Sequence, residues 1–120
     1  MSVDYSVTST DDVESVVPDE WGGMWFFREP LDCDRFGVTL MELEPGGKGK
    51  PHDHATDGQE EVYLVVDGEL TVQLGGGGDE PPEGQLTLEA GEALRVGAET
   101  WRQLHNHGDE LVRLVITGAP

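Results

Sequence analysis

The chain has 120 residues, 36% of them hydrophobic, a size that fits one domain with its own core. It carries 25 acidic and 7 basic side chains, and the resulting net charge of −18 argues against binding a phosphate backbone or an anionic membrane. No apolar run approaches the ~20 residues that span a bilayer, and no apolar stretch follows a basic start, so we expect a cytoplasmic protein without a secretory signal.

Residues 1–35 are expected to form an N-terminal arm and edge segment. Thr10–Val17 is interpreted as a short helix, because acids would occupy its first turn and Pro18 would end it. Trp21–Arg28 holds four large aromatic side chains around two glycines, which we expect to pack one end or edge of the domain. Cys33 lies between two aspartates that disfavour a thiolate, and as the single cysteine it forms no internal disulfide, so we expect an inert packing residue.

From residue 36 to 118 the sequence has the pattern of one all-β domain. Short segments rich in Val, Leu and Tyr are separated by turns about every ten residues. Strands are expected at Gly37–Leu43, Glu61–Val66, Glu69–Leu74, Gln85–Leu88, Ala93–Val96, Trp101–His105 and Leu111–Ile116. Asp67–Gly68 is typical of a hairpin turn, and Gly75–Gly84 is expected to be a flexible loop. The pattern favours a β-sandwich or barrel.

All four histidines occur in two His-x-His pairs, His52 with His54 and His105 with His107. Residues two apart on a strand point to the same face, so each pair could present two imidazoles together. The first pair is followed by Glu61, which opens the next predicted strand. Two imidazoles and one carboxylate form a set that suits Fe(II) and also accepts Mn, Ni, Co or Zn.

The spacing around the first pair resembles the first motif of the cupin family. That motif is a glycine, five residues, His-x-His, a short gap, a glutamate, six residues and a glycine. The chain has Gly46, His52, His54, Glu61 and Gly68 in this order. The departure is the gap before the glutamate, which holds six residues where the family has three or four.

The second cupin motif is matched less completely. It begins with a glycine and ends with an asparagine, which correspond to Gly91 and Asn106. Between them, Gly97 stands where the motif has proline, Glu99 where it has glycine, and Arg102 where it has the histidine that normally supplies a fourth ligand.

The resemblance implies a double-stranded β-helix, or jelly-roll barrel, with His52, His54 and Glu61 as ligands of a divalent transition metal at the barrel mouth. Arg102 has no lone pair to donate and is not a ligand. We expect it beside the metal, paired either with Glu61 or with an anionic substrate. Tyr63 shares the face of Glu61 and is expected to line the wall that the substrate contacts.

Several alternatives remain open for the site. Glu60 could replace Glu61, although the six-residue spacing to the next glycine favours Glu61. The first histidine pair could instead lie on a surface loop. If Arg102 faces inward, alternation turns His105 and His107 outward unless a β-bulge reverses them.

Two principal hypotheses follow for the function. The first is a metal-dependent enzyme, such as a dioxygenase, isomerase or decarboxylase, that acts on a small anionic molecule. The second is a non-catalytic cupin that binds a small anionic ligand. A metal-free, epimerase-like cupin with a histidine base is a further alternative. A fused transcriptional regulator is excluded, because the sequence shows no helix-turn-helix segment.

The acids are spread along the whole chain, and Lys48 and Lys50 are its only lysines. A dispersed acidic surface with scarce lysine resembles the proteins of extreme halophiles, in which salt screens the self-repulsion that opposes folding. The alternative is an ordinary acidic protein.

We also expect a homodimer. Val62, Leu64 and Val66 are apolar and would lie on the opposite face of their strand from the site. Trp101 is interpreted as an outer-face packing or dimer residue rather than as a platform for a ligand.

Overall fold

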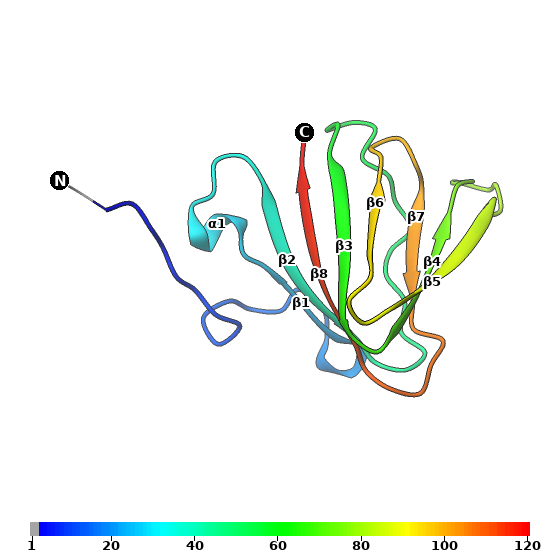
Figure 1. The fold of residues 1–120 in the computed structure, drawn as a ribbon, viewed down its shortest axis with the longest axis horizontal. Helices are drawn as coiled ribbons and strands as arrows, with labels where there is room; N and C mark the ends of the chain where they lie inside the picture. Colours follow the sequence, from blue (N-terminus) through cyan, green and yellow to red (C-terminus); the bar gives the residue numbers. More distant parts are fainter. Residues whose placement is uncertain (1–2) are drawn as a thin grey trace.

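The computed structural model describes residues 3–120 and confirms the all-β jelly-roll fold. Eight strands form two antiparallel sheets that curve around a common core (Figure 1). In spatial order, the larger sheet contains β1 (Gly22–Phe26), β2 (Gly37–Leu43), β8 (Val112–Ala119), β3 (Glu60–Asp67) and β6 (Ala93–Val96). The smaller sheet contains β5 (Gly84–Glu89), β4 (Glu69–Leu74) and β7 (Arg102–His105). No helix within residues 3–120 has the length and apolar character to cross a membrane.

Alternation along each strand divides core from surface. On β3, Tyr63 and Val65 are each 1% exposed, whereas Val62 and Leu64 are 37% and 40% exposed. Inward side chains from both sheets form one hydrophobic cluster. Burying one large apolar side chain fully stabilises the fold by roughly 1.5–3 kcal/mol. The outward face of the larger sheet carries an apolar row across all five strands. That row consists of Trp25, Leu40, Val115, Leu64 and Ala93.

The long connection between β2 and β3 runs beside β7 and covers that edge of the smaller sheet. The Gly49 amide donates to the Leu104 carbonyl at 2.9 Å. His52 and Arg102 exchange two backbone hydrogen bonds of 3.0 and 2.9 Å. These bonds satisfy an edge strand that would otherwise present unpaired groups, and they fix the first histidine pair against the barrel.

Two residues of the cupin motifs shape the end of the barrel away from the site. Asn106 is fully buried, and its side-chain amide donates to the carbonyls of Leu43 at 2.9 Å and Glu110 at 2.8 Å. Gly68 has φ +82°, and a Cβ there would lie 2.5 Å from the Leu111 carbonyl oxygen, so a larger residue would displace the backbone.

The N-terminal segment corrects one expectation, because Thr10–Val17 does not form a helix. The Val16 amide donates to the Met24 carbonyl at 2.9 Å, and the Ser15 hydroxyl accepts from the Met24 amide at 2.9 Å. The segment is rich in β-branched residues, which favour extended backbone, and these bonds attach it to β1. A short helix, α1 (Arg28–Leu31), follows β1 in a segment where no helix was expected from the sequence.

Candidate metal centre

The side chains of His52, His54 and Glu61 converge inside the barrel. Each offers one potential ligand atom, and these three atoms lie within 4.8 Å of one another. Glu61 Oε1 is 3.2 Å from His54 Nε2 and 3.9 Å from His52 Nε2. Glu60, the alternative carboxylate, lies on the exposed side of β3 and forms an ion pair with Arg95. Of the two glutamates, the structure therefore brings Glu61 to the histidines.

Both imidazoles are held by acceptors on the side away from Glu61. His52 Nδ1 donates to the Lys50 carbonyl at 2.9 Å, and His54 Nδ1 donates to the Asp57 carboxylate, whose oxygens lie at 3.1 and 3.2 Å. A proton on Nδ1 leaves the Nε2 lone pair available as a metal ligand.

His54 Nε2 is a buried polar atom without a hydrogen bond in the described part of the chain, since its approach to Glu61 lacks hydrogen-bond geometry. A buried lone pair with no donor is costly. Its position beside a carboxylate and a second imidazole fits a divalent metal ion, which would satisfy all three groups at once.

Asp57 is the site residue that the sequence analysis missed. It belongs to the six-residue gap that departs from the first cupin motif. The loop closes through a 2.7 Å bond from the Gly58 amide to the His54 carbonyl, and the carboxylate also accepts from the Gln59 amide and side chain at 3.3 and 3.2 Å. Desolvation raises the pKa of Asp57, but the hydrogen bonds from His54 and from the Gln59 amide, with the charge of His54, together outweigh it and leave the pKa below its usual value. The extra length of this gap was the one feature of the sequence that could have pointed to Asp57.

Glu61 is the electrostatic centre of the site. Its Oε1 accepts a 2.6 Å hydrogen bond from the Tyr63 hydroxyl and lies 3.5 Å from Arg102 Nη1. Burial raises the pKa of Glu61, but the neighbouring His52, the Tyr63 hydroxyl that donates to Glu61, His54 and Arg102 together outweigh burial and lower the pKa below its ordinary value. The same carboxylate raises the pKa of His52. Burial, together with Glu61, raises the pKa of Tyr63, so the phenol stays a hydrogen-bond donor.

Arg102 faces the barrel interior and is 1% exposed. Besides the contact with Glu61, its Nη2 donates to the Gly97 carbonyl at 2.6 Å. The neighbouring positions of β7 alternate, which places His105 on the outer face, and its ring centroid lies 5.0 Å from that of His107. The structure does not bring this second histidine pair to the first.

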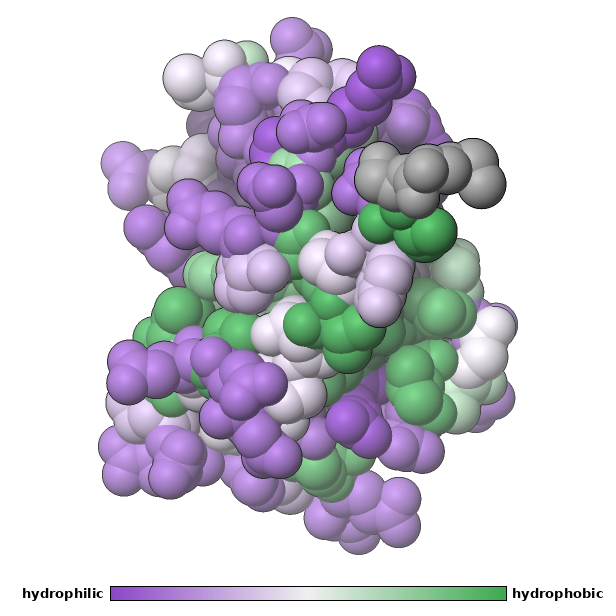
Figure 2. Space-filling view, turned by 90° about the vertical axis from the view of Figure 1, so that its left-hand side faces the viewer, coloured by the Kyte–Doolittle hydropathy of each residue, from purple (hydrophilic) through white to green (hydrophobic). Residues whose placement is uncertain are grey.

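A cavity of about 380 Å³ opens onto the three candidate ligands. Its wall is mainly apolar, and the aromatic segment near the N-terminus contributes Trp21 and Phe26 to it. On the side of the molecule that carries β1, apolar side chains gather in a band between hydrophilic regions (Figure 2). Lys48 and Lys50, both exposed, also line the cavity. Arg28 lines an adjoining cavity that shares His54 and Glu61 with the first.

Comparison with known proteins identifies the family. Residues 39–118 match the cupin domain family. The chain is 34% identical over 92 residues to the β-D-galactosidase Rv1717 of Mycobacterium tuberculosis, a match that covers 77% of this chain and 71% of that protein. The solved structure of BH2720 from Bacillus halodurans is 26% identical, with a TM-score of 0.65 over 72% of this chain, and the match spans 64% of that protein's length. The oxalate decarboxylase of Lactobacillus farciminis is 19% identical and shares the fold. Its structure matches with a TM-score of 0.75, over 91% of this chain and 31% of the length of the decarboxylase. This chain is a member of the cupin family.

Proposed function

We propose that this cupin is a metal-dependent enzyme that acts on a small anionic molecule, with His52, His54 and Glu61 as the ligands of a divalent transition metal. The observation that carries the proposal is the orientation of the two imidazoles. Both Nδ1 atoms donate to acceptors of the loop, which directs both Nε2 atoms toward Glu61. Three protein ligands leave coordination positions for substrate, as catalysis requires. When bound, the metal would polarise a ligating substrate oxygen or support redox chemistry of the dioxygenase type.

The distribution of basic residues supports an anionic substrate. The chain has only 7 basic residues, yet Lys48 and Lys50 line the cavity of the site and Arg28 lines the adjoining one. Neither lysine forms an ion pair within residues 3–120. In a strongly acidic protein, local positive charge at a low-dielectric opening concentrates anions there and not elsewhere.

Arg102 and Tyr63 are the proposed inner contacts of the substrate. In the structure both donate to Glu61 Oε1. A substrate carboxylate bound beside Glu61 would offer the guanidinium a second partner and would accept from the phenol. Arg102 is almost wholly buried, which favours substrates small enough to enter the barrel.

Lys50→Gln tests the anionic substrate class. Zn²⁺-loaded protein is titrated calorimetrically with a panel of small carboxylates, and the variant should bind them about fivefold more weakly. Arg35→Gln is the matched control, because Arg35 is exposed and lines neither cavity of the site. Equal losses in the two variants, or no carboxylate binding by the loaded protein, would contradict the proposal.

A second candidate is the hydrolysis of a β-galactoside, which the 34% identity to Rv1717 favours. Glycoside hydrolysis ordinarily uses two carboxyl groups, and Glu42 lines the same cavity as Glu61, although it is paired with Arg113 at 3.4 Å. A chromogenic β-galactoside distinguishes the candidates. Release of the chromophore that survives a chelator and is lost in Glu61→Gln would favour a metal-free glycosidase.

A further inference from the structure

The outer face of the smaller sheet differs in composition from the rest of this acidic chain. Two cross-strand rows on this face hold only uncharged residues with hydrogen-bonding side chains. The first row is Gln85, Gln73 and Gln103, and the second is Thr87, Thr71 and His105. Burial, His107 and Lys48 lower the pKa of His105, which keeps its imidazole neutral near pH 7. Two adjacent neutral rows are unusual in a chain with 25 acids, and the next row on the same face is the acidic pair Glu69 and Glu89.

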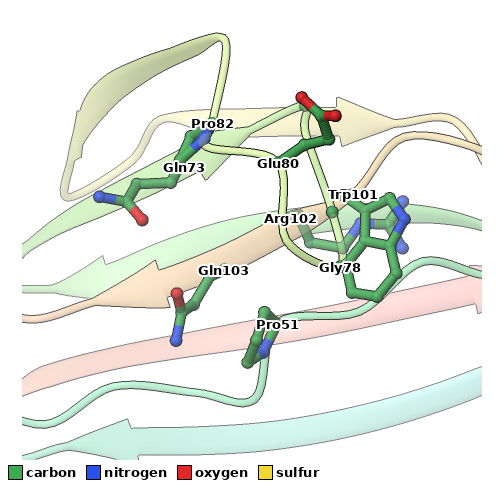
Figure 3. Close-up of a pocket in the computed structure, with 10 residues that line it drawn as sticks. Pro51, Gln73, Gly78, Glu80, Pro82, Trp101, Arg102 and Gln103 are labelled. Carbon is green, nitrogen blue, oxygen red and sulfur yellow. The ribbon is translucent and has the colours of Figure 1, made fainter.

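A cavity of about 410 Å³ lies at the end of this face next to the glycine-rich loop, and Gln73 and Gln103 of the first row line it (Figure 3). Trp101 bounds one end, and the side chains of Gln73 and Gln103 lie toward the other. Pro51 closes the side toward the β2–β3 connection, while Glu80 comes from the glycine-rich loop above. The volume falls in the range of small-molecule sites.

The glycine-rich loop is built against Trp101. A Cβ on Gly77, where φ is +112°, would lie 2.3 Å from Trp101 Cδ1 and Nε1, so a side chain there would displace the indole. The Gly75 amide donates to the Trp101 carbonyl at 2.9 Å. The glycine-rich loop, which was predicted to be flexible, therefore holds the Trp101 ring at the cavity wall.

In Gln73 and Gln103, one of the two polar atoms of the side-chain amide is hydrogen-bonded within the protein. Gln73 Oε1 accepts from His105 Nε2 at 3.1 Å, and Gln103 Nε2 donates to the Gly49 carbonyl at 2.9 Å. This orients both side chains and leaves the Gln73 amino group as a donor and the Gln103 carbonyl as an acceptor. The Glu80 carboxylate adds a further acceptor at the cavity.

We propose that this cavity binds a neutral saccharide. An aromatic ring suits the apolar face of a pyranose, and fixed amide donors and acceptors suit its hydroxyl groups. The carboxylate of Glu80 disfavours acidic sugars. Arg102, which alternates with Trp101 and Gln103 along β7, also lines this cavity, but none of His52, His54 and Glu61 does, so the site is separate from the three candidate metal ligands. Trp101 is then a ligand platform, in contrast to the packing role expected from the sequence.

The three tryptophans of the chain provide a direct readout, because each gives one indole N–H signal in a ¹⁵N-correlated NMR spectrum. Lactose should shift the Trp101 signal in a saturable manner and leave those of Trp21 and Trp25 in place. Galacturonate should not shift the Trp101 signal. Trp101→Phe assigns the signal.

Gln73→Glu should weaken lactose binding about tenfold, because it removes the donor at the cavity and keeps the acceptor for His105. Gln85→Glu makes the same change in the same row but outside the cavity, and should bind as the wild type does.

Several results would overturn the saccharide site. These are an unmoved Trp101 signal up to about 100 mM lactose, equal losses in the two glutamine variants, or shifts on dilution without sugar, which would mean self-association. Binding should survive a chelator and His54→Ala, and its loss in either would refute the separation from the metal centre.

Discussion

Asp57→Ala tests whether the extended loop orients a metal ligand. The Asp57 carboxylate accepts from His54 Nδ1 at 3.1 and 3.2 Å and so holds the imidazole with Nε2 toward Glu61. Loss of such a partner ordinarily weakens metal affinity 10–100-fold. The Asp57 side chain is 48% exposed, so water can partly replace it. We therefore expect a loss near the lower limit, about tenfold.

Calorimetric titration with Zn²⁺ measures this effect, and a thermal melt of each protein without metal verifies that the fold is intact. Asp53→Ala is the matched control. It removes an aspartate of the same loop whose carboxylate accepts from the Ala55 amide at 3.4 Å and contacts neither ring. Unchanged affinity in Asp57→Ala, or an equal loss in Asp53→Ala, would refute the positioning role of Asp57.

Three further predictions concern charge and assembly. Arg102→His should raise Zn²⁺ affinity, because it removes the cation 3.5 Å from Glu61 and supplies a fourth ligand; calorimetry showing equal or weaker binding would contradict this. The melting temperature should rise steeply up to molar KCl, because salt screens the −18 charge; a flat profile would argue against halophilic adaptation. Light scattering should report a dimer in high salt, and Leu64→Glu, in the outer apolar row, should give a monomer; a monomeric wild type would exclude this interface.

The sequence was sufficient to predict the strands and the grouping of His52, His54 and Glu61. Gly37–Leu43 and Ala93–Val96 have the bounds expected for them, because alternation and flanking turns mark both ends. The spacing of the first motif brought His52, His54 and Glu61 together before their distances were known. The resemblance of the second motif placed Arg102 inside the barrel, and alternation from that position turned His105 outward, as the structure shows for both.

The remaining features depend on contacts between distant segments. Thr10–Val17 has the acids and proline of a helix, but its hydrogen bonds to Met24 decide its conformation. Asp57 lies in a loop that closes on His54, and no local sequence pattern predicts this closure. The cavity beside Trp101 requires the pairing of β4 with β7 and the return of the glycine-rich loop over the indole.

Metal binding by single histidine variants tests the metal centre most directly. Purified wild type, loaded with Zn²⁺ and dialysed, should retain about one equivalent by elemental analysis. His52→Ala and His54→Ala should each lose it, because their Nε2 atoms face Glu61. His105→Ala and His107→Ala should retain it, since that pair lies outside the barrel mouth. Retention by the first two variants, or loss only in the second two, would contradict the assignment of the site.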